Sequence, residues 1–239
     1  MNTKSLLLRV AAPVAALGIV TAACGGTKND SANTTATSAM QGEHAGMTTA
    51  ESASSASDLR AALTGLLTEH VYLATNATGA ALRGDTKSFE AYAAALNGPT
   101  NSNTSDLTAA ITSAYGADVG NAFDGLWRSN GHIPAFVAYT QAVAKNDKAG
   151  ADKALADLTA YAKTFGTTMN SVNSNLPADA VTQDIVMHAT TLKAVIDAQK
   201  AGDSTQAATA LREAVQHMSG TAEVLAAATV KKFPDKFPT

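Results

Sequence analysis

The sequence has little of what several classes of protein require. Its 239 residues include one cysteine and one tryptophan, with 5% aromatic and 15% charged residues. A single cysteine excludes an internal disulfide framework and a cysteine-ligated zinc finger. The formal net charge of -3 argues against nucleic acid as a partner, because nucleic-acid-binding surfaces are usually basic. No apolar run reaches the roughly 20 residues that a mature membrane-spanning helix needs.

Alanine, by contrast, is abundant. The chain contains 52 alanines, more than a fifth of all its residues, and only 6 prolines. Alanine has the highest intrinsic helix propensity, and its small side chain lets neighbouring helices approach closely. The composition therefore predicts tightly packed helices.

The N-terminus is typical of a secretory signal peptide. Lys4 and Arg9 form a short positive segment, residues 10–20 are mostly apolar, and the small residues 21–23 precede Cys24. This ending resembles a bacterial lipobox, in which the cysteine becomes the lipidated first residue of the mature protein. The simpler alternative is an ordinary signal peptide with an incidental cysteine. We expect residues 1–23 to be removed and the protein to be lipid-anchored to the cell membrane, on its extracytoplasmic face.

A flexible linker is expected after the signal peptide. Residues 24–57 comprise the predicted lipidated cysteine and a tether rich in Ser, Thr, Asn, Ala and Gly. Such a segment is expected to be flexible, because it buries too little apolar surface to offset its ordering entropy. Met40, His44 and Met47 lie close together in it, and thioether and imidazole ligands suit Cu(I). Chance in a low-complexity segment is the alternative explanation.

The rest of the chain, residues 58–239, is predicted to be an all-α domain. Its apolar residues recur at intervals of three and four, and no strand-like alternation is sustained. Asp58 is the expected N-cap of the first helix. Pro134 either breaks a helix or occupies the first turn of a new one. The expected helices span about residues 58–82, 86–96, 106–115, 118–129, 134–145, 147–173, 177–199 and 203–230.

Three predicted helical hairpins each carry a histidine at the same distance from the turn. His70, His132 and His188 each lie 14 residues before a turn residue, at Gly84, Asn146 and Gly202, that is followed by aspartate. We therefore expect repeated antiparallel hairpins, at about residues 58–97, 132–173 and 177–230, packed as one or two helical bundles. Alanine-rich hairpins that resemble each other by composition alone are the alternative. All three histidines fall on apolar faces and should point inward.

The last hairpin suggests a metal site. Reflection through the turn at residues 202–203 places His188 opposite His217, and Met187 opposite Met218. Two imidazoles on helices with axes 8–10 Å apart can share one metal ion. We expect His188 and His217 to be the principal ligands, with His70 and then His132 joining through packing between hairpins. In each histidine–methionine pair the histidine is the preferred ligand.

Glu69, next to His70, is a candidate ligand or a residue that orients the histidine. A solvated position at the edge of the apolar face is the alternative. Each histidine also has an ordinary structural interpretation, as a neutral, hydrogen-bonded core residue. The Glu-x-x-His pairs of di-iron bundles do not occur in this sequence, and no catalytic motif is recognisable, so we do not expect an enzyme.

Three blocks of sequence resemble a group of exported helical proteins of Gram-positive bacteria. They are LRAALTGLLTEHVYLATNATGAALRGD from residue 59, YGADVGNAFDGLWR from residue 115, and IVMHATTLKAVIDAQKAGD with LREAVQHMSGTAEVLA from residue 185. Some members are labelled copper-amine-oxidase-like because of an attached domain. The resemblance implies a helical fold and an exported location but no activity. The stretch SNGHIP at residues 129–134 departs from the pattern, in which the histidine follows tryptophan and arginine more closely.

These observations favour a membrane-anchored, extracytoplasmic metal-binding lipoprotein, with copper as the leading metal and a role in sequestration, delivery or sensing. The alternative is a structural or interaction module of the cell envelope with a protein partner and no metal. A haem held between His188 and His217 is a third hypothesis.

Overall fold

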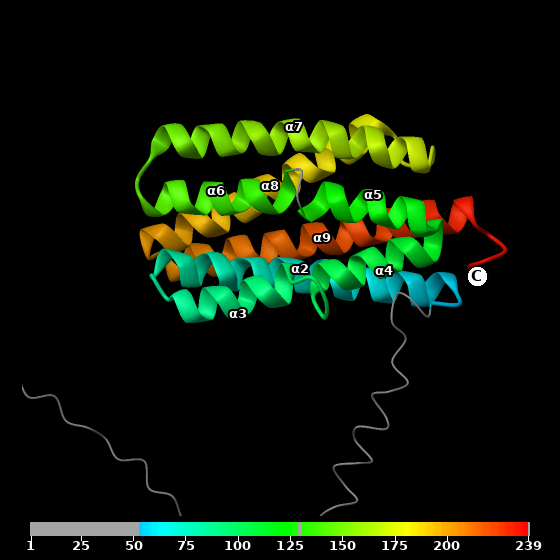
Figure 1. Cartoon of the computed structure of the whole chain (residues 1–239), viewed down its shortest axis with the longest axis horizontal. Helices are drawn as coiled ribbons and strands as arrows, with labels where there is room; N and C mark the ends of the chain where they lie inside the picture. The colour runs from blue at the N-terminus through cyan, green and yellow to red at the C-terminus, as the bar shows by residue number, and fades with distance from the viewer. Residues whose placement is uncertain (1–52, 129–130, 239) are drawn as a thin grey trace, which may run out of the picture. The chain divides into compact units, whose positions relative to one another are not determined.

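The structure, a computed structural model, describes residues 53–128 and 131–238. Within these ranges the chain is all-helical and contains no strand, so the predicted fold class is confirmed (Figure 1). The helices pack against one another. They are α2 (Ala56–Leu82), α3 (Thr86–Asn97), α4 (Asn103–Tyr115), α5 (Ala117–Arg128), α6 (His132–Ala144), α7 (Lys148–Val172), α8 (Ala178–Ala201) and α9 (Ser204–Lys232).

Two helices begin earlier than predicted, because serine side chains cap them. The hydroxyl of Ser55 accepts a hydrogen bond from the backbone N–H of Asp58, so Ser55, and not Asp58, is the N-cap of α2. Ser102 forms a capping box with Ser105, and α4 therefore starts at Asn103 and not near residue 106. Pro134 lies in the first turn of α6, which is the second of the two alternatives that the sequence left open.

The three hairpin turns, at residues 83–85, 145–147 and 202–203, have the same local structure. Residues 84, 146 and 202 adopt the left-handed conformation, with φ of 71°, 56° and 71°. In each turn the following aspartate donates its backbone N–H to an alanine carbonyl five residues earlier, and its carboxylate caps the next helix. The turns lie together at one end of the helical unit, on the left of Figure 1.

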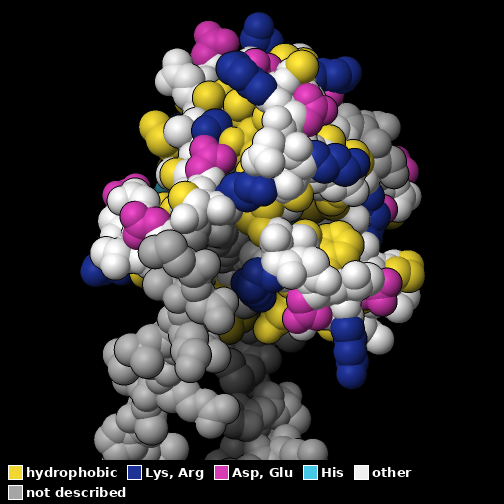
Figure 2. Space-filling view, turned by 90° about the vertical axis from the view of Figure 1, so that its left-hand side faces the viewer, with side chains coloured by type: hydrophobic (Ala, Val, Ile, Leu, Met, Phe, Trp, Pro, Cys, Tyr) yellow, Lys and Arg dark blue, Asp and Glu magenta, His cyan; other side chains and the backbone are white. Residues whose placement is uncertain are grey.

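Figure 2 shows that end of the unit, where Lys and Arg side chains are interspersed with Asp and Glu. The surface around the turns is thus mixed in charge and carries no large field of one sign.

Helix α2 is central to the packing, since it contacts α3, α4, α6, α8 and α9, while α7 packs on α6 and α8. The buried apolar side chains form two clusters. One includes Val71, Trp127 and Tyr161, and the other includes Phe136 and Leu192. The histidine site described below lies where these two clusters meet.

Several predictions fall on residues outside the described ranges. They concern the signal peptide at residues 1–23, the lipidated Cys24, the tether up to residue 52, and the linker ligands Met40, His44 and Met47. The last two residues of the predicted tether, 56 and 57, belong to α2. Among the described helices, none combines the length and the apolar character needed to cross a bilayer.

Candidate metal centre

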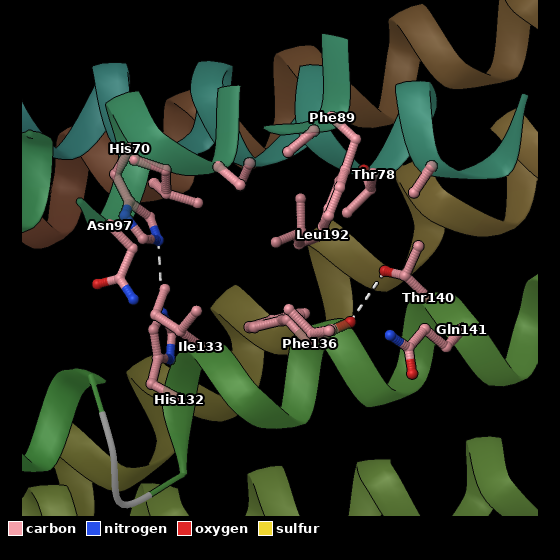
Figure 3. A pocket seen from close by; sticks show the side chains of 16 residues that line it. His70, Thr78, Phe89, Asn97, His132, Ile133, Phe136, Thr140, Gln141 and Leu192 are labelled. Atoms are coloured by element: carbon pink, nitrogen blue, oxygen red, sulfur yellow. Dashed lines mark hydrogen bonds between the residues drawn. The ribbon is translucent and has the colours of Figure 1, made fainter. Parts of the chain in front are cut away.

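Three histidines from three helices converge in the interior. His70 lies on α2, His132 begins α6 and His188 lies on α8, and their side chains are between 0% and 1% exposed. One ring nitrogen from each lies within 4.8 Å of the other two. Nε2 of His132 is 3.4 Å from Nε2 of His70, and Figure 3 shows these two rings facing each other. Three such groups could hold a metal ion.

The repeated turns explain why the three rings meet at one level. A helix rises about 1.5 Å per residue, so 14 residues place each histidine about 21 Å from its turn. Because all three turns lie at the same end, the equal spacing brings the three histidines to the same height. The inward apolar faces then turn the rings toward one another.

Aromatic rings enclose the three imidazoles. The Trp127 ring lies 4.2 Å from the His132 ring and 5.2 Å from the His70 ring, measured between centroids. Phe136 packs edge-on against His132 at 5.4 Å, and Tyr161 lies 5.3 Å from the same ring. An apolar environment of this kind strengthens electrostatic and hydrogen-bonding interactions made within it.

Several polar atoms in this enclosure lack a hydrogen-bond partner among the described residues. They include Nδ1 of His132, both ring nitrogens of His188, Nε1 of Trp127 and the hydroxyl of Tyr161. A buried polar group without a partner costs about 1–3 kcal/mol, so native proteins rarely leave several together. Most of these unpartnered atoms lie on the three histidines or on the rings that surround them.

Burial keeps all three imidazoles neutral. It lowers the pKa of His70 to about 4, and the neighbouring Asn103 amide opposes this shift only in part. Burial also holds the pKa of His132 and that of His188 well below the ordinary value, and repulsion from His70 adds to both shifts. A neutral imidazole offers a lone pair, which is the form that binds a metal ion.

Glu69 is placed beside the centre and not in it. Its side chain is exposed, and its Oε2 accepts a hydrogen bond of 2.9 Å from Nδ2 of Asn103, a buried residue of α4. The same amide donates to the carbonyl of Leu66. Glu69 thus orients Asn103, which in turn lies against His70. Glu69 is not part of the convergent group, and its exposure also fits the solvated position at the edge of the apolar face.

His217, which the sequence pairs with His188, contacts the backbone of α8. Its Nε2 lies 3.0 Å from the backbone carbonyl of Asp184, and it does not belong to the convergent group. The register of the hairpin is nevertheless right, since reflection pairs Asp184 with Thr221 and their side chains are hydrogen-bonded. Reflection fixes height along the axis but not rotation about it, and the face of α9 turned inward carries Met218. His217 is thus not among the three histidines that the structure brings together, and its pairing with His188 for a metal or haem stays a prediction.

The two candidate methionines differ in their environment. Met218 is buried in the apolar cluster with Trp127, while Met187 is 51% exposed. No carboxylate joins the three imidazoles in the group found among the described residues. The candidate ligand set is three neutral nitrogens.

An apolar cavity of about 260 Å³ reaches the centre between α2, α3 and α6. His70 and His132 line one end of it, and Thr140 and Gln141 the other, as Figure 3 shows. Gln141 is exposed, so this end opens to solvent. The cavity gives the buried imidazoles a route to the surface.

Comparison with protein-family models, curated proteins and solved structures finds no match to this chain. The resemblance to exported Gram-positive proteins therefore stays a prediction, and the site is interpreted from its own geometry.

Sequence reasoning missed Asn103 and the enclosing role of the aromatic rings. Tyr161 follows from the sequence, because reflection through a centre between Asn146 and Asp147 pairs it with His132. Asn103 fell in a segment predicted to be a loop, and its contact with α2 spans 37 residues. No local pattern signals such a contact.

Proposed function

We propose that the protein binds a single metal ion through His70, His132 and His188. The observation that carries the proposal is the convergence of three buried, neutral imidazoles from three helices. Each alone would be an ordinary core histidine. Together they form a ligand set held in place by the packing of the whole domain.

The spacing suits a metal ion. Two nitrogens that are each about 2.0–2.1 Å from one metal, at a tetrahedral angle, lie roughly 3.3 Å apart. The Nε2 atoms of His70 and His132 already have this separation, at 3.4 Å. The ring nitrogen of His188 lies within 4.8 Å of the other two, so bringing it to the same separation needs a movement of at most about 1.5 Å.

Copper in its monovalent state is the metal that we propose. Imidazole nitrogen suits copper and zinc alike, so the ligand type alone does not choose between them. The charge of the ion distinguishes the two metals, because the free-energy cost of burying an ion grows with the square of its charge. No carboxylate of the group offsets that cost. Cu(I) carries half the charge of Zn²⁺ into this apolar, aromatic enclosure.

The burial of the centre favours sequestration over rapid exchange. Three ligands with almost no exposed surface release an ion only if the helices part or the ion leaves through the cavity. Together with the predicted signal peptide and Cys24, this supports a lipid-anchored protein that holds copper at the outer face of the cell membrane. Delivery or sensing would need a partner that opens the site.

A structural role is the alternative. The contact between Nε2 of His132 and Nε2 of His70 has the length of a weak hydrogen bond between two neutral rings. In that case the histidines only stabilise the core of an envelope module, and its function lies on its surface. This hypothesis leaves the ring nitrogens of His188 without partners among the described residues.

Elemental analysis of the protein purified from its native envelope tests the proposal. We expect about one copper per chain, retained on dialysis and lost from a variant with His70, His132 and His188 all replaced by alanine. A fully folded native protein that holds no metal and takes up neither Cu(I) nor Zn²⁺ would favour the structural role.

A further inference from the structure

The cavity beside the histidines has the size of a ligand site. A cavity of about 150 Å³ is enough to admit benzene. The space of about 260 Å³ between α2, α3 and α6 is larger, and scaling from benzene gives a guest of about ten non-hydrogen atoms. It is one continuous space that begins at Val137 and Gln141, which are exposed, and ends at His70 and His132, which are not.

The walls of the cavity define the chemistry of the guest. Apolar side chains make most of the lining, and no Lys, Arg, Asp or Glu belongs to it. They are alanines of α2 and α3 with Phe89, Leu96, Ile133, Phe136, Val137 and Leu192. The hydroxyls of Thr78 and Thr140 are hydrogen-bonded to backbone carbonyls of their own helices. A charged guest would find no counterion, so the guest that fits is neutral and mostly apolar.

The inner end of the cavity differs from its walls. His70 and His132 present imidazole rings there, the only ring nitrogens of the lining (Figure 3). Three protein ligands also leave a tetrahedral metal ion one open position. A nitrogen or oxygen atom at one end of the guest would hydrogen-bond to a ring nitrogen, or coordinate a metal ion held there.

We infer that this cavity binds a small neutral molecule with an apolar body and one nitrogen or oxygen donor, inserted with the donor toward His70 and His132. The body fills the alanine-lined space and Gln141 lies at its entrance. Occupation of the cavity closes the route to the centre and so controls release of the metal. Only the coordination step and this control rest on the proposed copper site, since the cavity itself is present without metal.

Two probes test the inference on the full chain at mildly alkaline pH, where both are neutral. 4-Phenylimidazole carries an apolar ring and a nitrogen donor, and butylbenzene has a similar size but no donor. We expect both to bind metal-free protein saturably, measured by calorimetry, with 4-phenylimidazole the tighter. Loading with Cu(I) should tighten the binding of 4-phenylimidazole alone and slow the transfer of copper to an external chelator.

Neighbouring alanines of α3 supply matched variants. Ala93 lines the cavity and Ala94 is exposed and does not. Ala93→Leu should weaken both probes by about tenfold or more, because it fills the space they occupy, while Ala94→Leu should leave both unchanged. Ala81→Leu, on α2, fills the same cavity and serves if the first variant does not fold.

Different failures separate the two proposals. Saturable probe binding in a protein that takes up no metal would overturn the copper site and keep the cavity. Metal uptake with no probe binding, or with binding that Ala93→Leu and Ala81→Leu leave intact, would overturn the cavity. Equal affinity of the two probes in both metal states would overturn the insertion of the donor toward the histidines.

Discussion

Nε2 of His70 and Nε2 of His132 lie 3.4 Å apart, although 62 residues separate them in the chain. This pair joins α2 to α6, and His188 of α8 completes the group. The distance equals the separation of two nitrogens bound to one metal ion within about 0.1–0.2 Å. The centre is thus close to a ligating geometry without any rearrangement of helices.

Removing any ligand of the centre should weaken metal binding. Replacement of His132 or His188 by alanine takes away one of three donors, and we expect the affinity for Cu(I) to fall by a factor of about 100 or more, measured by competition with a chelator. His217→Ala is the matched control, because His217 contacts Asp184 and lies outside the group. Equal losses in the His188→Ala and His217→Ala variants would contradict the assignment.

Trp127 should report metal binding directly. It is the only tryptophan of the chain, and its ring contacts the rings of His70 and His132. A copper ion bound to those histidines would quench its fluorescence, and the quenching should saturate at one equivalent. Substitution of Trp127 by phenylalanine should abolish the signal and keep the metal. Continued quenching beyond one equivalent in the native protein would indicate binding elsewhere.

Acid should destabilise the metal-free protein. In the folded chain the pKa of His70 is lowered from 6.5 to about 4 by burial, so the unfolded chain binds a proton first as pH falls. The free energy of unfolding is therefore constant above about pH 6.5 and decreases between pH 6.5 and 4, by about 3 kcal/mol for His70 alone. His132 and His188, whose pKa values are also lowered, steepen the decrease. Urea unfolding at a series of pH values measures it.

The variant His70→Leu provides the control for this pH dependence. It removes one titrating group from the centre and should flatten the curve between pH 6.5 and 4. A variant with the same slope as the native protein would show that other groups cause the acid sensitivity.

Two glycines should respond oppositely to alanine. A Cβ on Gly166 of α7 would lie 2.4 Å from the carbonyl oxygen of Ala178 and 2.4 Å from Oγ1 of Thr182, so Gly166→Ala should cost about 1–3 kcal/mol of stability and push α8 away. Gly65 is exposed and has nothing within 4 Å, and Gly65→Ala should stabilise α2 by up to about 1 kcal/mol. Thermal unfolding compares them, and a neutral Gly166→Ala would refute close packing of α7 on α8.

Much of the fold follows from the sequence because it rests on local signals. Helical periodicity and the turn residues Gly84, Asn146 and Gly202 predict the hairpins, since a left-handed residue followed by a capping aspartate ends one helix and starts the next. The errors are local too. Ser55 caps α2 in place of the predicted Asp58, and Ser102 caps α4 ahead of residue 106, where that helix was predicted to start.

The site follows from the sequence only in part. Periodicity correctly predicts that His70, His132 and His188 point inward, and the common spacing of 14 residues predicts their equal distance from the turns. Which histidines meet depends on the rotation of each helix and on contacts between hairpins, and no spacing along one helix encodes either. For this reason the spacing favours His188 with His217, whereas the structure groups His188 with His70 and His132.

The most direct test of the centre is X-ray absorption spectroscopy of the copper-loaded protein. We predict Cu(I) bound by about three imidazole nitrogens at roughly 2.0 Å, with no sulfur in the first shell, and the loss of this spectrum in the His188→Ala variant. A spectrum dominated by sulfur at about 2.3 Å, or one that His188→Ala leaves unchanged, would contradict a centre built from His70, His132 and His188.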